Sequence, residues 1–254
     1  MARLIVNADD FGLHLSVNKA IENCFRFGSV NSTSVMANGS ALDIPLLLKL
    51  SDKGLLTGVH ITWVNEPWLT QNIYIHSWRQ LLHRMAFGGS AFITQMKQEA
   101  EAQVELLLRQ NIPLHHIDSH QHVHHLPGLW TILKGLQLKH SIPRIRVAHV
   151  CHKSLLRKNI SGFVLNYLAG RYANHTTYCC VGIKHAGNYT LDLLRQELEI
   201  SSGVNTELIV HPGINNAELN NRYSHWSFNW EQEYGALMEP GFLFTLKEAG
   251  LKFH

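Results

Sequence analysis

The residues best suited to chemistry in this chain are the histidines between positions 115 and 125. Six of the eleven positions in that run are histidine. A solvated loop gains nothing from so many imidazoles, and a packed core satisfies them only with difficulty. Neutral imidazole is the commonest nitrogen ligand of metal ions in proteins. The run therefore predicts a metal site, and the rest of the chain must supply a carboxylate and further ligands.

Two adjacent carboxylates, Asp9 and Asp10, follow a short apolar strand near the start of the chain, and Gly12 comes after them. In α/β folds, functional groups gather at the C-terminal ends of buried strands. Neighbouring side chains on a strand point to opposite faces, so these two share a pocket only where the strand breaks into a turn. The structural alternative is a helix cap or a turn pair, where Asp is common.

Two further strand-like segments end in histidine. The segment 55–62 carries His60 near its end, and the run that begins at Glu207 reaches His211 before Pro212 and Gly213 stop it. A single histidine on a strand is more often a satisfied structural residue. Four strand ends that carry His or Asp nevertheless form a pattern if those ends meet on one rim.

The segments that must position these residues alternate between strands and helices. Strands are predicted at 3–10, 29–36, 55–62, 144–149, 177–182 and 207–211, with a further strand that ends within the histidine-rich run and helices between them. This alternation predicts parallel βα units, and about seven units predict an α/β fold of the irregular (β/α) barrel type. The active site of a barrel lies at the C-terminal ends of its strands. Residues 64–90 are interpreted as an irregular insertion at the rim, followed by a long helix at 92–110.

The bulk composition is that of an ordinary globular protein. The chain has 254 residues, 45% of them hydrophobic and 16% charged, with a formal charge of +3. This fits a single domain spanning 1–254. No basic run favours nucleic acid as a partner, and no segment fits a transmembrane span or a signal peptide. A homodimer is the commonest soluble oligomer and stays open.

The chain contains few cysteines, and none forms a Cys-x-x-Cys pair. The four are Cys24, Cys151, Cys179 and Cys180. We interpret all four as reduced and structural, which fits a cytoplasmic protein.

The strand-end residues fit one catalytic metal centre. Such a centre needs about three protein ligands and an open position for water. We expect Asp10, His60 and His120 to be the ligands of one divalent ion, which lowers the pKa of its water and polarises a carbonyl. Asp9 is expected to act as general base and His211 as general acid on the leaving amine. The predicted reaction is hydrolysis of an acyl bond.

The other polar residues of the histidine run are expected to support this centre. If strand geometry continues past Ser119, then Asp118, His120, His122 and His124 share one face. One ion cannot take all of them, so His122 and His124 are predicted to contact ligands or substrate, and Asp118 to fix the tautomer of a ligand histidine. The remaining histidines of the run are interpreted as structural: His115, His116 and His125.

Four segments of the chain together resemble the YdjC-like carbohydrate deacetylases, a family with chitooligosaccharide deacetylases and a hopanoid-associated branch. They are Val6–Gly12, Gly58–His60, Asp118–His124 and His211–Gly213. The resemblance covers nearly the whole chain in the expected order. It implies an irregular (β/α) barrel related to polysaccharide deacetylases. It also implies removal of the N-acetyl group from an acetylated amino sugar, an oligosaccharide or a glycolipid.

The resemblance also implies a metal and its ligands. The family's metal is divalent, magnesium in chitooligosaccharide deacetylases, on residues that match Asp10, His60 and His120. Its broader relatives imply the base role for Asp9 and the acid role for His211. By ligand type alone, two imidazoles favour zinc or another transition metal over magnesium.

Two other functions use the same residues. A metal-dependent phosphoesterase is one, although the chain lacks the second acidic cluster of a two-metal phosphatase. A non-catalytic carbohydrate-binding protein on the same fold is the other, although a binder needs neither Asp9 beside Asp10 nor His211. Five tryptophans lie in or beside predicted loops: Trp63, Trp68, Trp78, Trp226 and Trp230. One or two are expected to stack on a sugar ring, and the rest to pack.

Overall fold

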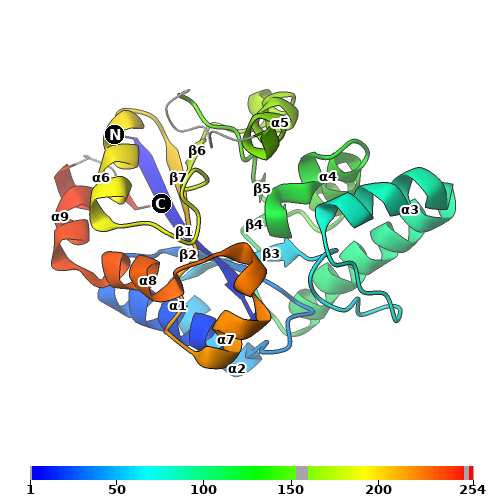
Figure 1. Cartoon of the computed structure of the whole chain (residues 1–254), viewed down its shortest axis with the longest axis horizontal. Helices are drawn as coiled ribbons and strands as arrows, with labels where there is room; N and C mark the ends of the chain where they lie inside the picture. The colour runs from blue at the N-terminus through cyan, green and yellow to red at the C-terminus, as the bar shows by residue number, and fades with distance from the viewer. Residues whose placement is uncertain (1, 153–159, 249–251, 254) are drawn as a thin grey trace.

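A curled sheet of parallel strands forms the centre of the molecule, and helices cover its outer side (Figure 1). The computed structural model describes residues 2–152, 160–248 and 252–253. The strand order is β5-β4-β3-β2-β1-β7-β6, and β8 pairs with the start of β1. Every one of these pairings is parallel. The predicted irregular barrel of about seven parallel strands is confirmed.

The strands lie close to their predicted positions. Their bounds are β1 Arg3–Phe11, β2 Ser32–Val35, β3 Leu56–Ile61, β4 His116–Ser119, β5 Arg144–Ile145, β6 Cys179–Val181, β7 Thr206–Val210 and β8 Lys252–Phe253. The helices are α1 Leu15–Phe27, α2 Ile44–Ser51, α3 Trp78–Arg109, α4 Leu129–Lys139, α5 Ile160–Gly170, α6 Leu191–Ile200, α7 Ala217–Arg222, α8 Trp230–Met238 and α9 Pro240–Glu248. The described residues also include three 3₁₀ turns: η1 His120–His125, η3 Ala173–His175 and η4 Ser224–Trp226.

Helix α3 begins earlier than its sequence pattern indicates. Ser77 caps it by accepting a hydrogen bond from the backbone of Gln80, so the helix starts at Trp78 inside the segment interpreted as irregular. Gly89, with φ 57° and ψ −153°, interrupts it before the predicted long helix continues. A glycine adopts this conformation without the steric penalty of a Cβ, so the two helical pieces meet at a kink.

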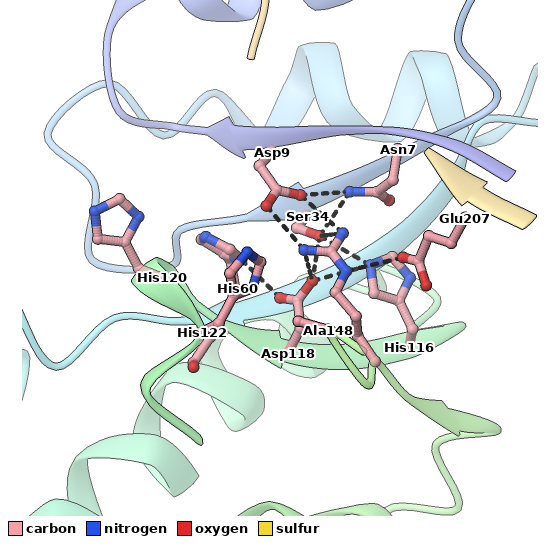
Figure 2. Close-up of polar contacts among 12 residues, drawn as sticks. Asn7, Asp9, Ser34, His60, His116, Asp118, His120, His122, Ala148 and Glu207 are labelled. Atoms are coloured by element: carbon pink, nitrogen blue, oxygen red, sulfur yellow. Dashed lines mark hydrogen bonds and ion pairs between the residues drawn. The ribbon is translucent and has the colours of Figure 1, made fainter. Parts of the chain in front are cut away.

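Alternate residues of the strands separate an apolar layer from a polar interior. Leu4, Val6 and Ala8 of β1 belong to the main apolar core with the helices. Asn7 and Asp9, between and beyond them, are buried and bond to other polar strand residues instead. This follows from the two-residue period of a strand. The inside of the barrel is therefore a polar network, shown in Figure 2.

The two edge strands of the curled sheet, β5 and β6, are joined without a backbone ladder. In the part of the chain that the structure describes, no ladder pairs β5 with β6. The segment after β5 reaches β6 through the Cys180 N–H, which donates to the His149 carbonyl at 3.1 Å, and through a disulfide between Cys151 and Cys179. We call this contact the seam. The prediction of four reduced cysteines is wrong for Cys151 and Cys179, because the fold brings residues 28 apart in sequence into contact.

Cys24 and Cys180 are free and buried. With two of the four cysteines bonded, the cysteines no longer support the cytoplasmic expectation, which stays untested. Among the helices that the structure describes, none combines the length and the apolar character that crossing a bilayer requires.

Candidate active site

Asp9 and Asp10 face one pocket because β1 is irregular where they lie. The register between β1 and β2 shifts between Ala8 and Phe11, and Asp10 has a φ of 68°. In a regular strand the two side chains would point to opposite faces, and a bulge re-aims one of them. The strand continues to Phe11, so the device is a bulge inside the strand and not the turn at its end that the sequence predicts.

Asp10 lies against two imidazoles from different parts of the barrel. Its Oδ1 atom is 3.3 Å from Nε2 of His60 and 3.0 Å from Nδ1 of His120. Ligand atoms of the three residues all lie within 4.8 Å of one another, and all three residues are buried. Burial alone would raise the pKa of Asp10, but the two imidazoles outweigh it and hold that pKa well below its usual range.

Asp118 orients His60 toward Asp10. Its Oδ1 atom lies 2.6 Å from Nδ1 of His60. A carboxylate only accepts, so Nδ1 carries a proton, and Nε2 is the ring nitrogen that faces Asp10. Burial lowers the pKa of His60, yet the charges of Asp118 and Asp9 raise it to about 10. The gap between Nε2 and the Asp10 carboxylate therefore favours a cation.

The residues present fit a divalent metal ion. Two imidazoles and one carboxylate are a common ligand set for catalytic transition metals. His120 adds a second observation, because its Nε2 atom is buried without a hydrogen-bond partner. Buried polar atoms are rarely left unpaired, and each exception calls for a missing partner. The group Asp10, His60 and His120 could hold one ion, and its identity is not fixed by these contacts.

Asp9 lies on the other side of the pocket, against Arg146. The guanidinium donates to both carboxylate oxygens of Asp9 at 2.8 Å, and Asn7 donates to Oδ1 at 2.7 Å. Burial raises the pKa of Asp9, but the charges of Arg146 and His60 and the hydrogen bonds from Arg146 together outweigh it, so the net shift is downward. Asp9 is therefore held ionised and in a fixed orientation.

Arg146 also binds Asp118 and Glu207, which makes it the centre of a buried ionic network. It is fully buried, with Nη1 2.6 Å from Asp118 Oδ2 and Nε 2.8 Å from Glu207 Oε1. Glu207 also pairs with Arg144. Asp9, His60 and Asp118 could by spacing hold a second ion. The guanidinium already lies between the two carboxylates, so we assign that space to Arg146 and not to a metal.

His211 approaches Asp9 from the end of β7. Its Nε2 atom is 4.0 Å from Asp9 Oδ2. Behind it, the buried Glu233 accepts from the His211 backbone N–H at 2.6 Å and lies 3.9 Å from Nδ1 of the ring. The Phe228 ring lies 5.2 Å from the His211 ring. The carboxylate and imidazole predicted as base and acid therefore face each other across the pocket.

His116 bonds to Ser34 and packs against β3, in keeping with the structural role that the sequence predicts. Ser34 donates its one proton to Asp118 Oδ2 at 2.8 Å, so His116 Nε2 must donate to Ser34 Oγ at 2.9 Å. The His116 ring lies directly over Gly58, where a Cβ would come within 2.3 Å of it. Burial lowers the pKa of His116 to about 3, so it stays neutral.

The shared face predicted for Asp118, His120, His122 and His124 is not formed. The chain leaves β4 at Ser119 and enters the 3₁₀ turn η1, where Gln121 and His122 both have a φ of 54°. The backbone therefore turns instead of continuing the strand, and the two-residue period ends. Each histidine of the run consequently has surroundings of its own.

His122 and His124 differ after this turn. His124 is fully buried, and its nitrogens bond to Ser119 Oγ at 2.6 Å and to the Arg146 carbonyl at 3.0 Å. It therefore has no nitrogen left for a substrate and instead holds the backbone of Arg146. His122 lies close enough to Arg146, Asp9 and Asp118 for their charges to act on its ring. Its Nδ1 atom is buried without a partner, and burial lowers its pKa to about 3.

Aromatic rings form the wall of the pocket between His120 and His211. Trp226 lies 5.1 Å from the His120 ring and 5.6 Å from the Phe228 ring, and Tyr223 stacks on it at 4.6 Å. Tyr223 donates to the fully buried Glu66 at 2.7 Å. Arg222 also binds Glu66, at 3.0 Å to each carboxylate oxygen, so its charge is paired within the protein.

The sequence reasoning missed Arg146, Glu207 and Glu233. Arg146 lies just after a two-residue strand, and Glu207 lies in an otherwise apolar strand. A charged residue inside a buried strand was the one available signal, because such a residue is almost never fully buried without a partner. The signal identifies neither partner, since these residues meet only in the folded barrel.

Comparisons with known proteins agree with this fold and these segments. A carbohydrate deacetylase of Vibrio parahaemolyticus is 30% identical over 160 residues, which cover 60% of this chain and 62% of that relative. A chitooligosaccharide deacetylase of Escherichia fergusonii is 33% identical over 149 residues, 55% of this chain and 57% of that relative. The chain thus matches about three-fifths of the length of these curated relatives.

Solved structures extend the similarity to the whole chain. A protein of Enterococcus faecalis V583, named for cellobiose-phosphate cleavage, has a TM-score of 0.77 at 18% identity and covers 100% of this chain and 97% of its own. A peptidoglycan N-acetylglucosamine deacetylase has a TM-score of 0.51 at 11% identity, with 99% and 85% covered. At such identities both show a shared fold. The sequence model of the YdjC-like protein family matches residues 3–248, and the chain belongs to that family.

Proposed function

We propose that this protein is a metal-dependent hydrolase that removes the N-acetyl group from an acetylated amino sugar or oligosaccharide. The proposal depends on one observation: the two adjacent carboxylates, Asp9 and Asp10, contact different groups. Asp10 faces His60 and His120, while Asp9 faces Arg146 and His211. The names of the curated relatives supply the substrate class.

In this proposal Asp10, His60 and His120 hold one divalent ion. When bound, such an ion polarises the substrate carbonyl and lowers the pKa of a water molecule. Asp118 keeps the His60 proton on Nδ1, so that Nε2 remains a ligand atom. The imidazoles favour zinc or another transition metal, and the family resemblance favours magnesium.

Asp9 is the proposed general base and His211 the proposed general acid. Arg146 lowers the basicity of Asp9 but fixes its orientation, which is acceptable because the metal lowers the pKa of the water that Asp9 must deprotonate. Asp9 would take one proton from the water, and His211, in its protonated form and 4.0 Å from Asp9, would give a separate proton to the leaving amine. Glu233 holds the backbone of His211 in place.

The decisive experiment measures acetate and free amine released from N-acetylglucosamine oligomers by protein loaded with zinc or magnesium and by protein stripped with a chelator. We expect activity only with metal. Asp10→Asn should lose both metal and activity. Asp9→Asn should retain the metal and lose at least about 100-fold in kcat. Asp192→Asn, the same change on an exposed part of α6, is the matched control.

Other outcomes identify the competing functions. Release of phosphate from sugar phosphates, without acetate release, would show a phosphoesterase. Sugar binding without any hydrolysis in metal-loaded protein would show a carbohydrate-binding protein. An Asp9→Asn variant with full activity and bound metal would contradict the base role. Unchanged turnover by His211→Ala would contradict the acid role.

A further inference from the structure

Asn65 and Glu66 are neighbours in the loop that follows β3, and their side chains bind two different segments of the chain. Asn65 accepts a hydrogen bond from Gln121 Nε2 at 2.7 Å, and Gln121 directly follows the proposed ligand His120. Glu66 accepts from the Tyr223 hydroxyl at 2.7 Å. The two residues therefore join the turn η1 and the segment after α7 to one short piece of backbone.

The loop that carries this pair is anchored elsewhere, on α3. Thr62 exchanges two hydrogen bonds with the Gln103 side chain, one from its N–H at 2.8 Å and one to its carbonyl at 3.0 Å. The Trp63 indole N–H donates to the Met96 carbonyl at 2.9 Å. Both residues of the pair are themselves buried. The pair is therefore a fixed point against which the two segments are held.

His120 needs support of this kind because it lies just outside the sheet ladder. Asp10 and His60 belong to paired strands, whereas His120 begins η1. Two successive residues of that turn, beginning with Gln121, have a φ of 54°. Such a backbone is unfavourable for residues other than glycine, so contacts from elsewhere must hold it. The hydrogen bond from Gln121 to Asn65 is one such contact.

Glu66 reaches the ring of His120 through two aromatic side chains. Tyr223, which it binds, stacks on Trp226 at 4.6 Å, and the Trp226 ring lies 5.1 Å from the His120 ring. Burial raises the pKa of Glu66, and the charge of His120 is among the causes that lower it, so the two groups are close enough to interact. The backbone of His120 is thus held through Asn65, and its ring through Glu66.

We propose that Asn65 and Glu66 are positioning residues that aim His120 at a cation shared with Asp10 and His60. The inference rests on the proposed function, since it takes those three residues as ligands of one metal ion. It assigns the pair to metal affinity and coordination geometry. Partners behind a metal ligand typically change metal affinity by about 10- to 100-fold when they are removed.

The test measures Zn²⁺ affinity by calorimetry and the visible absorption of the Co²⁺-loaded protein. Gln121→Ala removes the bond to Asn65 beside the ligand, so it should lower the Zn²⁺ affinity about tenfold. Tyr223→Phe removes only the hydroxyl that binds Glu66 and acts through two rings, so it should lower the affinity less, about threefold. Both variants should shift the Co²⁺ bands, because these bands depend on coordination geometry.

Tyr189→Phe is the matched control. Tyr189 donates its hydroxyl to the buried Glu197 of α6 at 2.6 Å, so this variant also breaks a buried Tyr–Glu hydrogen bond, outside the ligand group. It should keep the Zn²⁺ affinity and the Co²⁺ spectrum. Melting curves of the metal-free variants check that each one is folded.

The outcomes separate this inference from the proposed reaction. Unchanged Zn²⁺ affinity in Gln121→Ala overturns the role of Asn65, and unchanged affinity in Tyr223→Phe overturns that of Glu66. An equal loss in Tyr189→Phe and Tyr223→Phe would show general destabilisation and also overturns the role of Glu66. Zn²⁺ binding that depends on both arms, without acetate release, overturns the proposed reaction and supports the positioning role.

Discussion

Two regions of the barrel are held together by different means: the strands from β1 to β4, and the contact between β5 and β6. From β1 to β4 each strand pairs with its neighbour through a backbone ladder, and Asp10 and His60 lie on this laddered part, with His120 directly after it. Between β5 and β6 the described residues form no ladder, and the two sides are joined by the seam disulfide, by the hydrogen bond from the Cys180 N–H to the His149 carbonyl and by packing of Ala148 against Cys180. Arg146, on the segment leading to the seam, binds Asp9 and Asp118 across the barrel. The proposed cation site thus depends on backbone pairing, and the orientation of Asp9 depends on side chains.

Removing Arg146 should have the largest effect on this arrangement. Arg146→Ala leaves Asp9, Asp118 and Glu207 buried without their shared cation, which should lower the free energy of unfolding by about 3–5 kcal/mol. Urea unfolding measures it. Arg146→Lys keeps the charge but loses the paired hydrogen bonds, so its free energy of unfolding should lie between those of the unmodified protein and Arg146→Ala. A loss below about 1 kcal/mol in Arg146→Ala would show that the ionic network does not hold the seam side together.

Breaking the disulfide should have the next largest effect. A bridge between residues 28 apart stabilises by about 3 kcal/mol in the chain-entropy account. The double variant Cys151→Ser/Cys179→Ser should lose about that much, and dithiothreitol should do the same to the unmodified protein. The reductant should not destabilise the double variant further. Four reactive thiols in the unreduced, unfolded protein would contradict the bridge.

A change inside the laddered half tests its packing. Gly58→Ala places a Cβ where the His116 ring lies, so it should cost about 1–3 kcal/mol through overpacking. Gly135→Ala is the control: Gly135 lies in α4 with no atom within 4 Å of a new Cβ, and it should gain up to about 1 kcal/mol. Thermal melting followed by circular dichroism measures both. Equal melting temperatures for the two variants would show that the ring moves aside freely.

Acid should lower the stability of the folded protein gradually. Burial lowers the pKa of His116 to about 3 and of His125 to about 4 in the folded protein, against 6.5 when unfolded. The unfolded chain therefore binds more protons between these values. Stability should fall as the pH drops below 6.5, by up to about 1.4 kcal/mol per unit for each histidine. His116→Gln should reduce the slope of unfolding free energy against pH, and an unchanged slope would contradict this account.

The strand ends were predictable from the sequence because they depend on short-range signals. Apolar runs that stop at Asp9, His60 and His211 identify both the strands and the rim they share. Parallel strands bring their C-terminal ends to one edge whatever the details of the loops. The grouping of Asp10, His60 and His120 follows from that rule, and the structure places them together.

The remaining contacts depend on backbone geometry and on distant partners. The residue types do not predict the positive φ of Gln121 and His122. The backbone turns there, so Asp118, His120, His122 and His124 do not share one face as predicted. Arg146 meets Asp9 across 137 residues of sequence, and Cys151 meets Cys179 only once β6 is in place. Local patterns do not encode such pairings, so the ionic network and the seam were both missed.

The bulge in β1 has a mechanical consequence. Asp9 and Asp10 are joined by one peptide unit in the middle of the sheet, so no hinge lies between them. The spacing between their Cα atoms is then fixed by that peptide unit and is insensitive to loop or domain movement. Tuning by evolution or by a ligand must instead act on what each carboxylate touches: the imidazoles of one, or the guanidinium of the other.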